Sequence, residues 1–390
     1  MNQFPAVAIG GPPHSGKSVL TYGLTQRLRA QCIDHYVLRA CPDGEGDWSQ
    51  EAPPETVRLI RNKSPFSRSF VEGICRDLNR RHLPLLVDVG GRPTPEQEAI
   101  FDHCTHAILI APEATASTEL PIWRDLAIRH GLAVLAELRS ALTGQEQIQA
   151  HKPVLQARVV GLERHRPVGG PVVDALATRL AALFHYEESE LRLAHLSQSP
   201  LEMTVEVDRL AQDMGLGPLP HTWQPEELPA VLEYLPQGES LALYGRGPAW
   251  LYAAVAIHVA PASLFQFDPR LGWVQPSTVR LQVNPAAHQP LRWQVVETAD
   301  HICLELRLVD AYVDYSEARE LALPSIPADR GLVISGRLPY WLLTGVVTAY
   351  RGQPWLATYR PQLDDQAVVV ASRLPARPVG SLIQMPTPGR

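Results

Sequence analysis

The chain has 390 residues, 45% hydrophobic and 19% charged, a composition typical of a globular protein with about two or three domains. Its formal net charge of -6 gives no global electrostatic basis for binding long DNA. No apolar run is long enough to span a membrane, and the five cysteines form no CxxC pair. We therefore expect a cytoplasmic protein with no membrane anchor, no disulfide framework and no zinc site.

A glycine-rich loop follows the first predicted strand, at residues 5–9. From Gly11 to Ser18 the sequence reads GPPHSGKS, which fits the phosphate-binding pattern GxxxxGK followed by Ser or Thr. The backbone N–H groups of Gly16, Lys17 and Ser18 would point at phosphate oxygens at the start of the next helix. Lys17 would reach the terminal phosphates, and the Ser18 hydroxyl would ligate Mg²⁺. The alternative is a chance match in a glycine-rich turn.

A second motif completes the predicted nucleotide site. The apolar run LPLLV at residues 83–87 reads as a buried parallel strand, and it ends on Asp88. An acid at this edge can hold Mg²⁺ directly or through water, although a plain strand-end aspartate is the alternative. Asn62, Lys63 and Ser64 lack the aspartate of the guanine-reading NKxD motif, which favours ATP over GTP.

Strands and helices continue to alternate up to about residue 190. This alternation predicts an α/β fold, with an N-terminal P-loop NTPase domain at residues 1–190 built on a doubly wound parallel sheet. The segment at 185–200 is polar and ends on a proline, so we expect the domain boundary there.

The second half contains an internal duplication. GRGPAWL at residues 245–251 recurs as GRLPYWL at 336–342, and the later block QFDPRL recurs as TYRPQL at nearly the same spacing. The repeat predicts two tandem small α/β domains, at 200–285 and 293–375, packed as a pseudo-dimer.

Each copy carries a turn that could bind an anion. Gly245, Arg246 and Gly247 close a predicted strand and open a helix, and Gly336 and Arg337 do the same in the second copy. Free N–H groups and an arginine at the carboxyl edge of a sheet are suited to a phosphodiester. A plain strand-to-helix turn is the alternative.

The polar residues that could cut such a ligand occur in the first copy. Asp268 and Arg270 follow its next strand, whereas His258 lies at the far end of a helix on the order of 15 Å long. His258 and Asp268 should therefore lie on opposite faces, so a ligand that needs both must lie between two stacked molecules. The alternatives are an ordinary helix-end histidine and a surface ion pair. In the second copy Arg360 and Gln362 replace Asp268 and Arg270, which predicts a degenerate site.

These blocks resemble the ring nucleases of type III CRISPR systems, which degrade cyclic tetra-adenylate. The resemblance is carried by GLVISGRLPYWL at residues 331–342, by GRGPAWL in the first copy and by DPRLG at 268–272. It implies a manganese-stimulated phosphodiesterase that binds its ring between stacked dimers, with a histidine from one face and an Asp and Arg from the other. Fusions to an AAA-like P-loop ATPase domain also occur, which fits residues 1–190.

The resemblance and the residues together give a working mechanism. We expect Arg246 and Arg270 to hold phosphates, Asp268 to bind a metal or activate the attacking oxygen, and His258 of a neighbour to act as general acid or base. The expected partners are cyclic tetra-adenylate, ATP and further copies of the chain. Three alternatives stay open: an ATPase or small-molecule kinase with a nucleotide-sensing C-terminal half, a non-catalytic oligoadenylate-binding protein, and an RNA exonuclease.

Overall fold

The computed structural model describes residues 4–41, 67–164, 166, 168–285, 290–309, 313–360 and 366–385. Residues 62–64, used above to favour ATP, and Gln362 lie outside this set. The chain divides into two compact units: Met1–Leu191 with Pro269–Gly272, and Arg192–Asp268 with Trp273–Arg390. Across the described residues, none of the helices combines the length and apolar character needed to cross a membrane.

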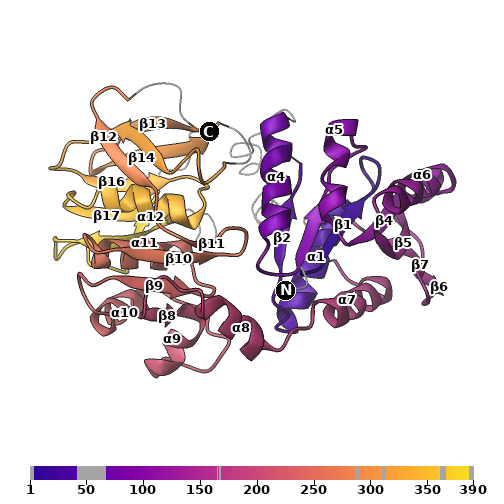
Figure 1. Cartoon of the computed structure of the whole chain (residues 1–390). Helices are drawn as coiled ribbons and strands as arrows, with labels where there is room; N and C mark the ends of the chain where they lie inside the picture. The colour runs from indigo at the N-terminus through magenta and orange to yellow at the C-terminus, as the bar shows by residue number, and fades with distance from the viewer. Residues whose placement is uncertain are drawn as a thin grey trace. The chain divides into compact units, whose positions relative to one another are not determined.

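The first unit is built on a seven-stranded sheet with the order β2-β3-β1-β4-β5-β7-β6 (Figure 1). All neighbouring strands are parallel except β6, which pairs antiparallel with β7. The strands are β1 Ala6–Gly10, β2 Tyr36–Arg39, β3 Leu85–Asp88, β4 His106–Pro112, β5 Ala133–Ala141, β6 Gln147–Ala150 and β7 Leu155–Val160. The helices are α1 Lys17–Ala30, α4 Arg68–Arg80, α5 Pro95–Glu98, η1 Phe101–His103, η2 Glu113–Thr115, α6 Ala116–Arg129 and α7 Pro171–Phe184.

Helices cover both faces of this sheet. Val7 and Ile9 of β1 join a buried cluster with apolar residues of α1 and α7. Successive strand residues point to opposite faces, so Gly10 faces the other side. A Cβ at Gly10 would lie 2.8 Å from Trp123 of α6, which is why this position takes a glycine. The close fit fixes the end of β1, where the glycine-rich loop begins.

The second unit contains three sheets. Their orders are β11-β10-β9-β8, β12-β15 and β13-β14-β16-β17-β18-β19. The strands are β8 Thr204–Glu206, β9 Leu241–Tyr244, β10 Leu264–Asp268, β11 Gly272–Val274, β12 Thr278–Gln282, β13 Leu291–Glu297, β14 His301–Leu308, β15 Glu320–Pro324, β16 Gly331–Ser335, β17 Trp355–Arg360, β18 Gln366–Ser372 and β19 Leu382–Gln384. The helices are α9 Val207–Asp213, η3 Pro225–Glu227, α10 Leu228–Tyr234, α11 Ala249–Val259 and α12 Tyr340–Ala349, and α8 Glu188–Leu196 contains the boundary between the units.

The two repeated segments share one strand arrangement. β8, β9 and β10 are parallel neighbours, and so are β14, β16 and β17. Glu206 pairs with Tyr244 in the first segment, and Glu305 pairs with Ser335 in the second. Tyr244 and Ser335 each precede the glycine of the repeated turn, so Glu206 and Glu305 occupy equivalent positions.

The same registration extends to the third strand of each segment. Leu243 pairs with Gln266, and Ile334 pairs with Thr358. Counting two residues on from Gln266 and Thr358 places Asp268 and Arg360 at equivalent positions, as the sequence comparison predicts. The helix that follows β9, α11, packs against its counterpart α12.

The expectation of a mixed α/β fold with parallel sheets is confirmed, but one strand is shorter than expected. The alternating pattern at 201–207 predicts a strand, whereas β8 covers only Thr204–Glu206 and α9 begins at Val207. Val207, Leu210 and Ala211 are buried at helical spacing, and burying them together outweighs the local alternation.

Candidate functional site

The glycine-rich loop turns sharply into α1. Gly16 has φ 90°, and a Cβ there would lie 2.9 Å from Leu162, so the turn needs glycine. Lys17 and Ser18 follow it in the first turn of the helix. The Lys17 ammonium donates hydrogen bonds of 2.8 Å each to the carbonyl oxygens of Gly11 and Pro12. Burial lowers the pKa of Lys17, and the charge of Asp88 opposes that shift.

Asp88 lies beside this loop because β3 is the direct neighbour of β1. In the sheet Asp88 pairs with Ile9, the residue before the end of β1. Its carboxylate oxygen Oδ2 accepts a hydrogen bond from the Ser18 hydroxyl over 2.9 Å. The structure therefore brings together the two predicted Mg²⁺ ligands, and both offer the hard oxygen atoms that Mg²⁺ prefers.

A third residue joins Asp88 that the sequence reasoning missed. Arg39, the last residue of β2, contacts Asp88 Oδ2 through a guanidinium nitrogen over 2.5 Å. The available signal was a charged residue at the end of the run YVLR at residues 36–39. Within the described ranges, no group of three or more His, Cys, Asp or Glu side chains gathers as a metal cluster.

In the second unit, the carboxylate of Asp208 lies against the first repeated turn. Gly245 has φ 107°, and a Cβ there would lie 2.3 Å from the carboxylate of Asp208. The backbone N–H of Arg246 donates to the other oxygen of Asp208 over 2.8 Å. One N–H group that was expected to face a phosphate is thus occupied by a carboxylate. Sequence reasoning missed Asp208 because its position was expected to follow the end of a longer strand.

The equivalent turn in the second segment meets an apolar residue, because a Cβ at Gly336 would lie against Leu306. Asp208 has no structural counterpart there: after Glu206 the chain turns into α9, whereas after Glu305 it continues in β14, and Arg307 lies 3.6 Å from Glu305. At the end of the third strand Arg360 replaces Asp268. Burial lowers the pKa of Arg360, and the neighbouring Tyr340 opposes that shift. At the end of its third strand the second segment therefore has a cation where the first has a carboxylate.

The two turns meet at one edge of the second unit. The Tyr340 hydroxyl, at the start of α12, donates to the Gly247 carbonyl oxygen over 2.9 Å. The Tyr340 and Tyr252 rings lie 5.0 Å apart, and the Tyr252 hydroxyl donates to the Gly245 carbonyl oxygen over 2.8 Å. Deeper in the contact, Gln266 Nε2 donates to Thr344 Oγ1 over 3.1 Å. Segments about 90 residues apart in sequence thus form a single edge.

Of the three predicted catalytic residues, His258 lies apart from Asp268 within the chain. Asp268 ends β10, which is parallel to β9, so it lies at the same sheet edge as the first turn. His258 lies in the last turn of α11, and its Nε2 is 3.0 Å from the Leu235 carbonyl oxygen. Because α11 runs back across the sheet, His258 lies at the other edge, as the helix length predicts. Arg270 lies in the 269–272 segment of the first unit, 3.6 Å from Asp77.

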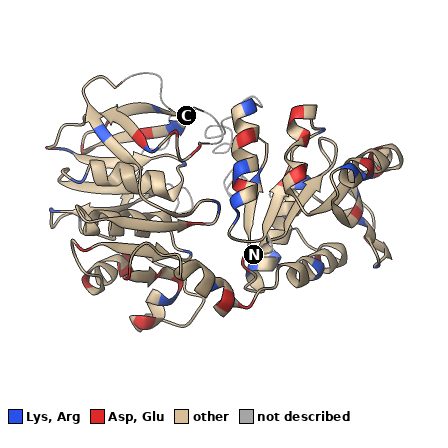
Figure 2. Cartoon of the chain, in the orientation of Figure 1, with Lys and Arg blue, Asp and Glu red and all other residues tan. Residues whose placement is uncertain are grey.

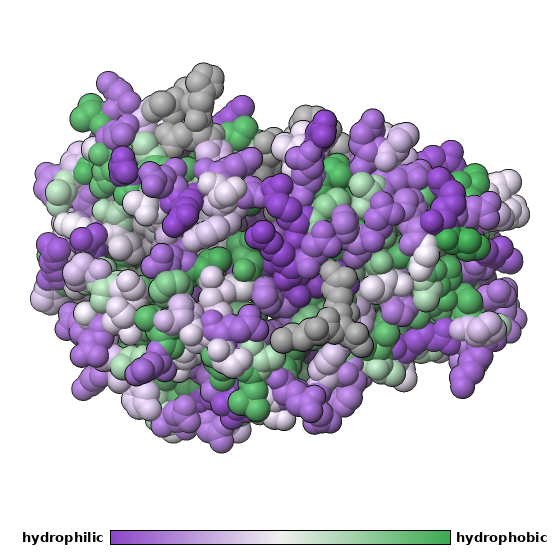
Figure 3. Space-filling view, in the orientation of Figure 1, coloured by the Kyte–Doolittle hydropathy of each residue, from purple (hydrophilic) through white to green (hydrophobic). Residues whose placement is uncertain are grey.

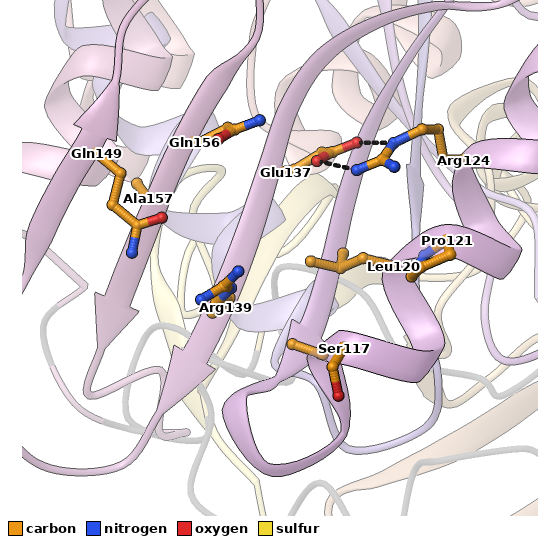
Figure 4. A pocket seen from close by; sticks show the side chains of 10 residues that line it. Ser117, Leu120, Pro121, Arg124, Glu137, Arg139, Gln149, Gln156 and Ala157 are labelled. Carbon is orange, nitrogen blue, oxygen red and sulfur yellow. Dashed lines mark hydrogen bonds and ion pairs between the residues drawn. The ribbon is translucent and has the colours of Figure 1, made fainter.

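A separate polar pocket lies between α6 and the strands β5, β6 and β7 of the first unit (Figure 4). Its buried acid, Glu137, is held by two bonds from Arg124, of 2.5 and 2.6 Å. Both carboxylate oxygens are therefore already engaged. We do not assign the predicted chemistry to this pocket.

Charge and hydropathy show no single dominant surface in the views drawn. Lys and Arg residues lie interspersed with Asp and Glu in both units (Figure 2). On the face drawn in Figure 3, apolar residues form scattered patches among polar ones. The informative charge pattern is thus the local one at the two turns.

These features define a mixed α/β chain with a glycine-rich loop in one unit and a repeated glycine-arginine turn in the other. Residues 306–384 match the family model described as CRISPR-associated protein (Cas_csx3). The match runs from β14 to β19 and includes the second repeated turn, with Gly336 and Arg337. The C-terminal part of the chain thus resembles a CRISPR-associated family.

Proposed function

We propose that the chain is a CRISPR-associated phosphodiesterase that binds cyclic tetra-adenylate at the joined edge of the second unit and cleaves it. The observation that carries this proposal is the bond from Tyr340 to Gly247, because it unites two anion-binding turns into one surface. The match to a CRISPR-associated family supports the biological setting.

The second segment supplies most of the binding in this proposal. Arg337 and Arg360 are cations that can hold phosphate oxygens, and the start of α12 adds backbone N–H groups with the helix dipole. The first turn contributes less, because Asp208 already accepts from the Arg246 N–H and would repel a phosphate. Gly336 leaves the chain room to turn, since a Cβ there would lie 2.4 Å from the Leu306 carbonyl oxygen.

The first segment supplies the cutting residue. Asp268 would activate the attacking hydroxyl or water, or hold a divalent ion such as Mn²⁺ that stabilises charge on the scissile phosphate. The attacking oxygen gives up its proton as it bonds to phosphorus, and the leaving ribose oxygen takes one up. His258 of a stacked neighbour would transfer a proton in that step, and Arg270 would stabilise the phosphate charge. The working unit in this proposal is a homo-oligomer.

The first unit binds ATP with Mg²⁺ in this proposal, as an AAA-like P-loop domain that regulates or assembles the enzyme. Gly11 and Gly16 shape the loop, Lys17 meets the terminal phosphates, and Ser18 and Asp88 hold the metal. Bound Mg²⁺ would neutralise phosphate charge. The hydrogen bond between Ser18 and Asp88 supports this assignment, because it holds the two proposed metal-binding oxygens 2.9 Å apart.

The test is incubation of the full chain with labelled cyclic tetra-adenylate, with and without Mn²⁺ and ATP, with chromatography of the products. We expect linear products from the wild type and none from Asp268→Ala or His258→Ala. Mixing these two variants should restore part of the activity, because each contributes an intact half-site to a stack. Wild-type rates in both single variants would rule out this site.

A second function is favoured by the Asp208 contact, which fills the first turn with an internal anion. In this alternative the chain is an ATPase or small-molecule kinase, and its C-terminal half senses a nucleotide without cutting it. Lys17→Ala distinguishes the two. In the alternative, Lys17→Ala should abolish all turnover. In the main proposal, it should abolish the ATP dependence of ring cleavage but leave the cleavage itself.

A further inference from the structure

The ion pair between Arg39 and Asp88 lies in the middle of the proposed nucleotide site. The Asp88 side chain is only 1% exposed and that of Arg39 is 14% exposed. A carboxylate this far from water needs a charge partner or several hydrogen bonds to remain ionised at low cost. Arg39 provides the charge, and the Ser18 hydroxyl adds one hydrogen bond.

The fold itself builds this contact. β2 and β3 are parallel neighbours, and Arg39 is paired with Asp88 in their register. The Ala40 N–H also donates to the Asp88 carbonyl oxygen over 2.9 Å, which holds the two strand ends together. The guanidinium is thus placed beside Asp88 by sheet pairing.

The guanidinium contacts the Asp88 oxygen that also faces Ser18, the other predicted Mg²⁺ ligand. Arg39 contacts Asp88 Oδ2 over 2.5 Å, and the Ser18 hydroxyl donates to that same atom over 2.9 Å. Mg²⁺ demands near-octahedral oxygen coordination at short distance, and it repels a cation packed against its ligand. Arg39 and Mg²⁺ therefore compete for Asp88.

We propose that Arg39 is an internal counter-ion that is exchanged for Mg²⁺ when the magnesium-nucleotide complex binds. This inference rests on the proposed nucleotide site. Arg39 keeps the buried Asp88 neutralised when no metal is bound, and metal entry displaces it. Binding of the nucleotide is thereby coupled to the end of β2, because Arg39 is its last residue.

The test compares wild type with Arg39→Gln in two measurements on the full chain. In EDTA without nucleotide, thermal unfolding of Arg39→Gln should begin at a lower temperature, because Asp88 loses its charge partner. Binding of fluorescent mant-ADP is then followed while Mg²⁺ is titrated. The Mg²⁺ concentration for half-maximal binding should fall by about tenfold in the variant, because the competing cation is gone. The milder Arg39→Lys should shift it less, in the same direction.

Arg124→Gln is the matched control, because Arg124 also neutralises a buried acid, Glu137, elsewhere on the sheet. It should lower the unfolding temperature and leave the Mg²⁺ requirement unchanged. A raised or unchanged Mg²⁺ requirement in both Arg39 variants would overturn the exchange, since Arg39 would then be a nucleotide ligand or a structural support. Absence of magnesium-dependent mant-ADP binding in wild type would instead overturn the nucleotide site, and the exchange with it.

Discussion

The Tyr340 hydroxyl donates a 2.9 Å hydrogen bond to the Gly247 carbonyl oxygen, and this bond joins the two repeated turns of the second unit. Ring contact between Tyr340 and Tyr252 and the deeper bond from Gln266 to Thr344 also hold the turns together. If both turns bind phosphates, as proposed, their fixed separation would suit two phosphates of one ligand, because the cost of orienting them is met during folding.

Removing that hydroxyl should loosen the edge. Tyr340→Phe should lower the stability of the second unit by about 1 kcal/mol, the usual net value of one hydrogen bond. It should also weaken binding of cyclic tetra-adenylate, measured by titration calorimetry. Tyr315→Phe removes a comparable 3.0 Å bond to the Gln275 carbonyl oxygen and serves as the control. Equal loss of affinity in both variants would argue against a joined edge.

The two turns should differ in their contribution to binding. Arg337→Ala should weaken binding of cyclic tetra-adenylate by about tenfold, as expected for loss of one charge-assisted phosphate contact. Arg246→Ala, at the equivalent position, should have a smaller effect because Asp208 already occupies its turn. A larger effect at Arg246 would assign the main binding to the first segment.

Neutralising Asp208 should improve anion binding. Asp208→Asn removes a negative charge from the Arg246 N–H while keeping an acceptor oxygen, so the ring should bind several-fold more tightly at low salt. The gain should shrink as salt is raised. Asp213→Asn, at the exposed end of α9, changes net charge equally and should leave the affinity nearly unchanged. A similar gain in both variants would mean that only overall charge matters.

The buried bond between Gln266 and Thr344 should be sensitive to a shape-conserving change. Thr344→Val leaves the Gln266 amide N–H without its acceptor, at a cost of about 1–3 kcal/mol. Chemical denaturation followed by tryptophan fluorescence measures this loss. Thr348→Val removes another threonine hydroxyl of α12, whose acceptor is the helix backbone, and should cost less.

His301 should make the second unit sensitive to acid. Burial lowers its pKa below the usual 6.5; Asp300 opposes that shift and Arg377 and Arg330 add to it. The unfolded chain therefore takes up a proton at higher pH than the folded one. The stability that neutral His301 contributes is fully present above about pH 6.5 and is lost progressively as the pH falls below that value.

The midpoint of urea unfolding should accordingly decrease between pH 7 and pH 5. His301→Gln should reduce that decrease, whereas the exposed His151→Gln should not. An unchanged pH dependence in His301→Gln would contradict this origin of the acid sensitivity.

Local sequence patterns predicted the parts of the fold that depend on neighbouring residues. The glycine-rich loop and the strand ending on Asp88 lie where the motifs place them, and strand pairing reproduces the alignment of Asp268 with Arg360. The contacts of Arg39 and Asp208 could not be read this way. Each joins segments that are distant in sequence: strand register places Arg39 beside Asp88, and the start of α9 after β8 places Asp208 beside the Arg246 N–H.

The exchange of Asp268 for Arg360 also bears on stoichiometry. Two identical turns would form a surface with two-fold symmetry, on which a ring with four equal phosphates could settle in equivalent ways. In the proposed site one half would attract the ring through Arg360 and the other carries Asp268, so the surface would have a direction. We expect one ring per chain, held on one side and cut on the other.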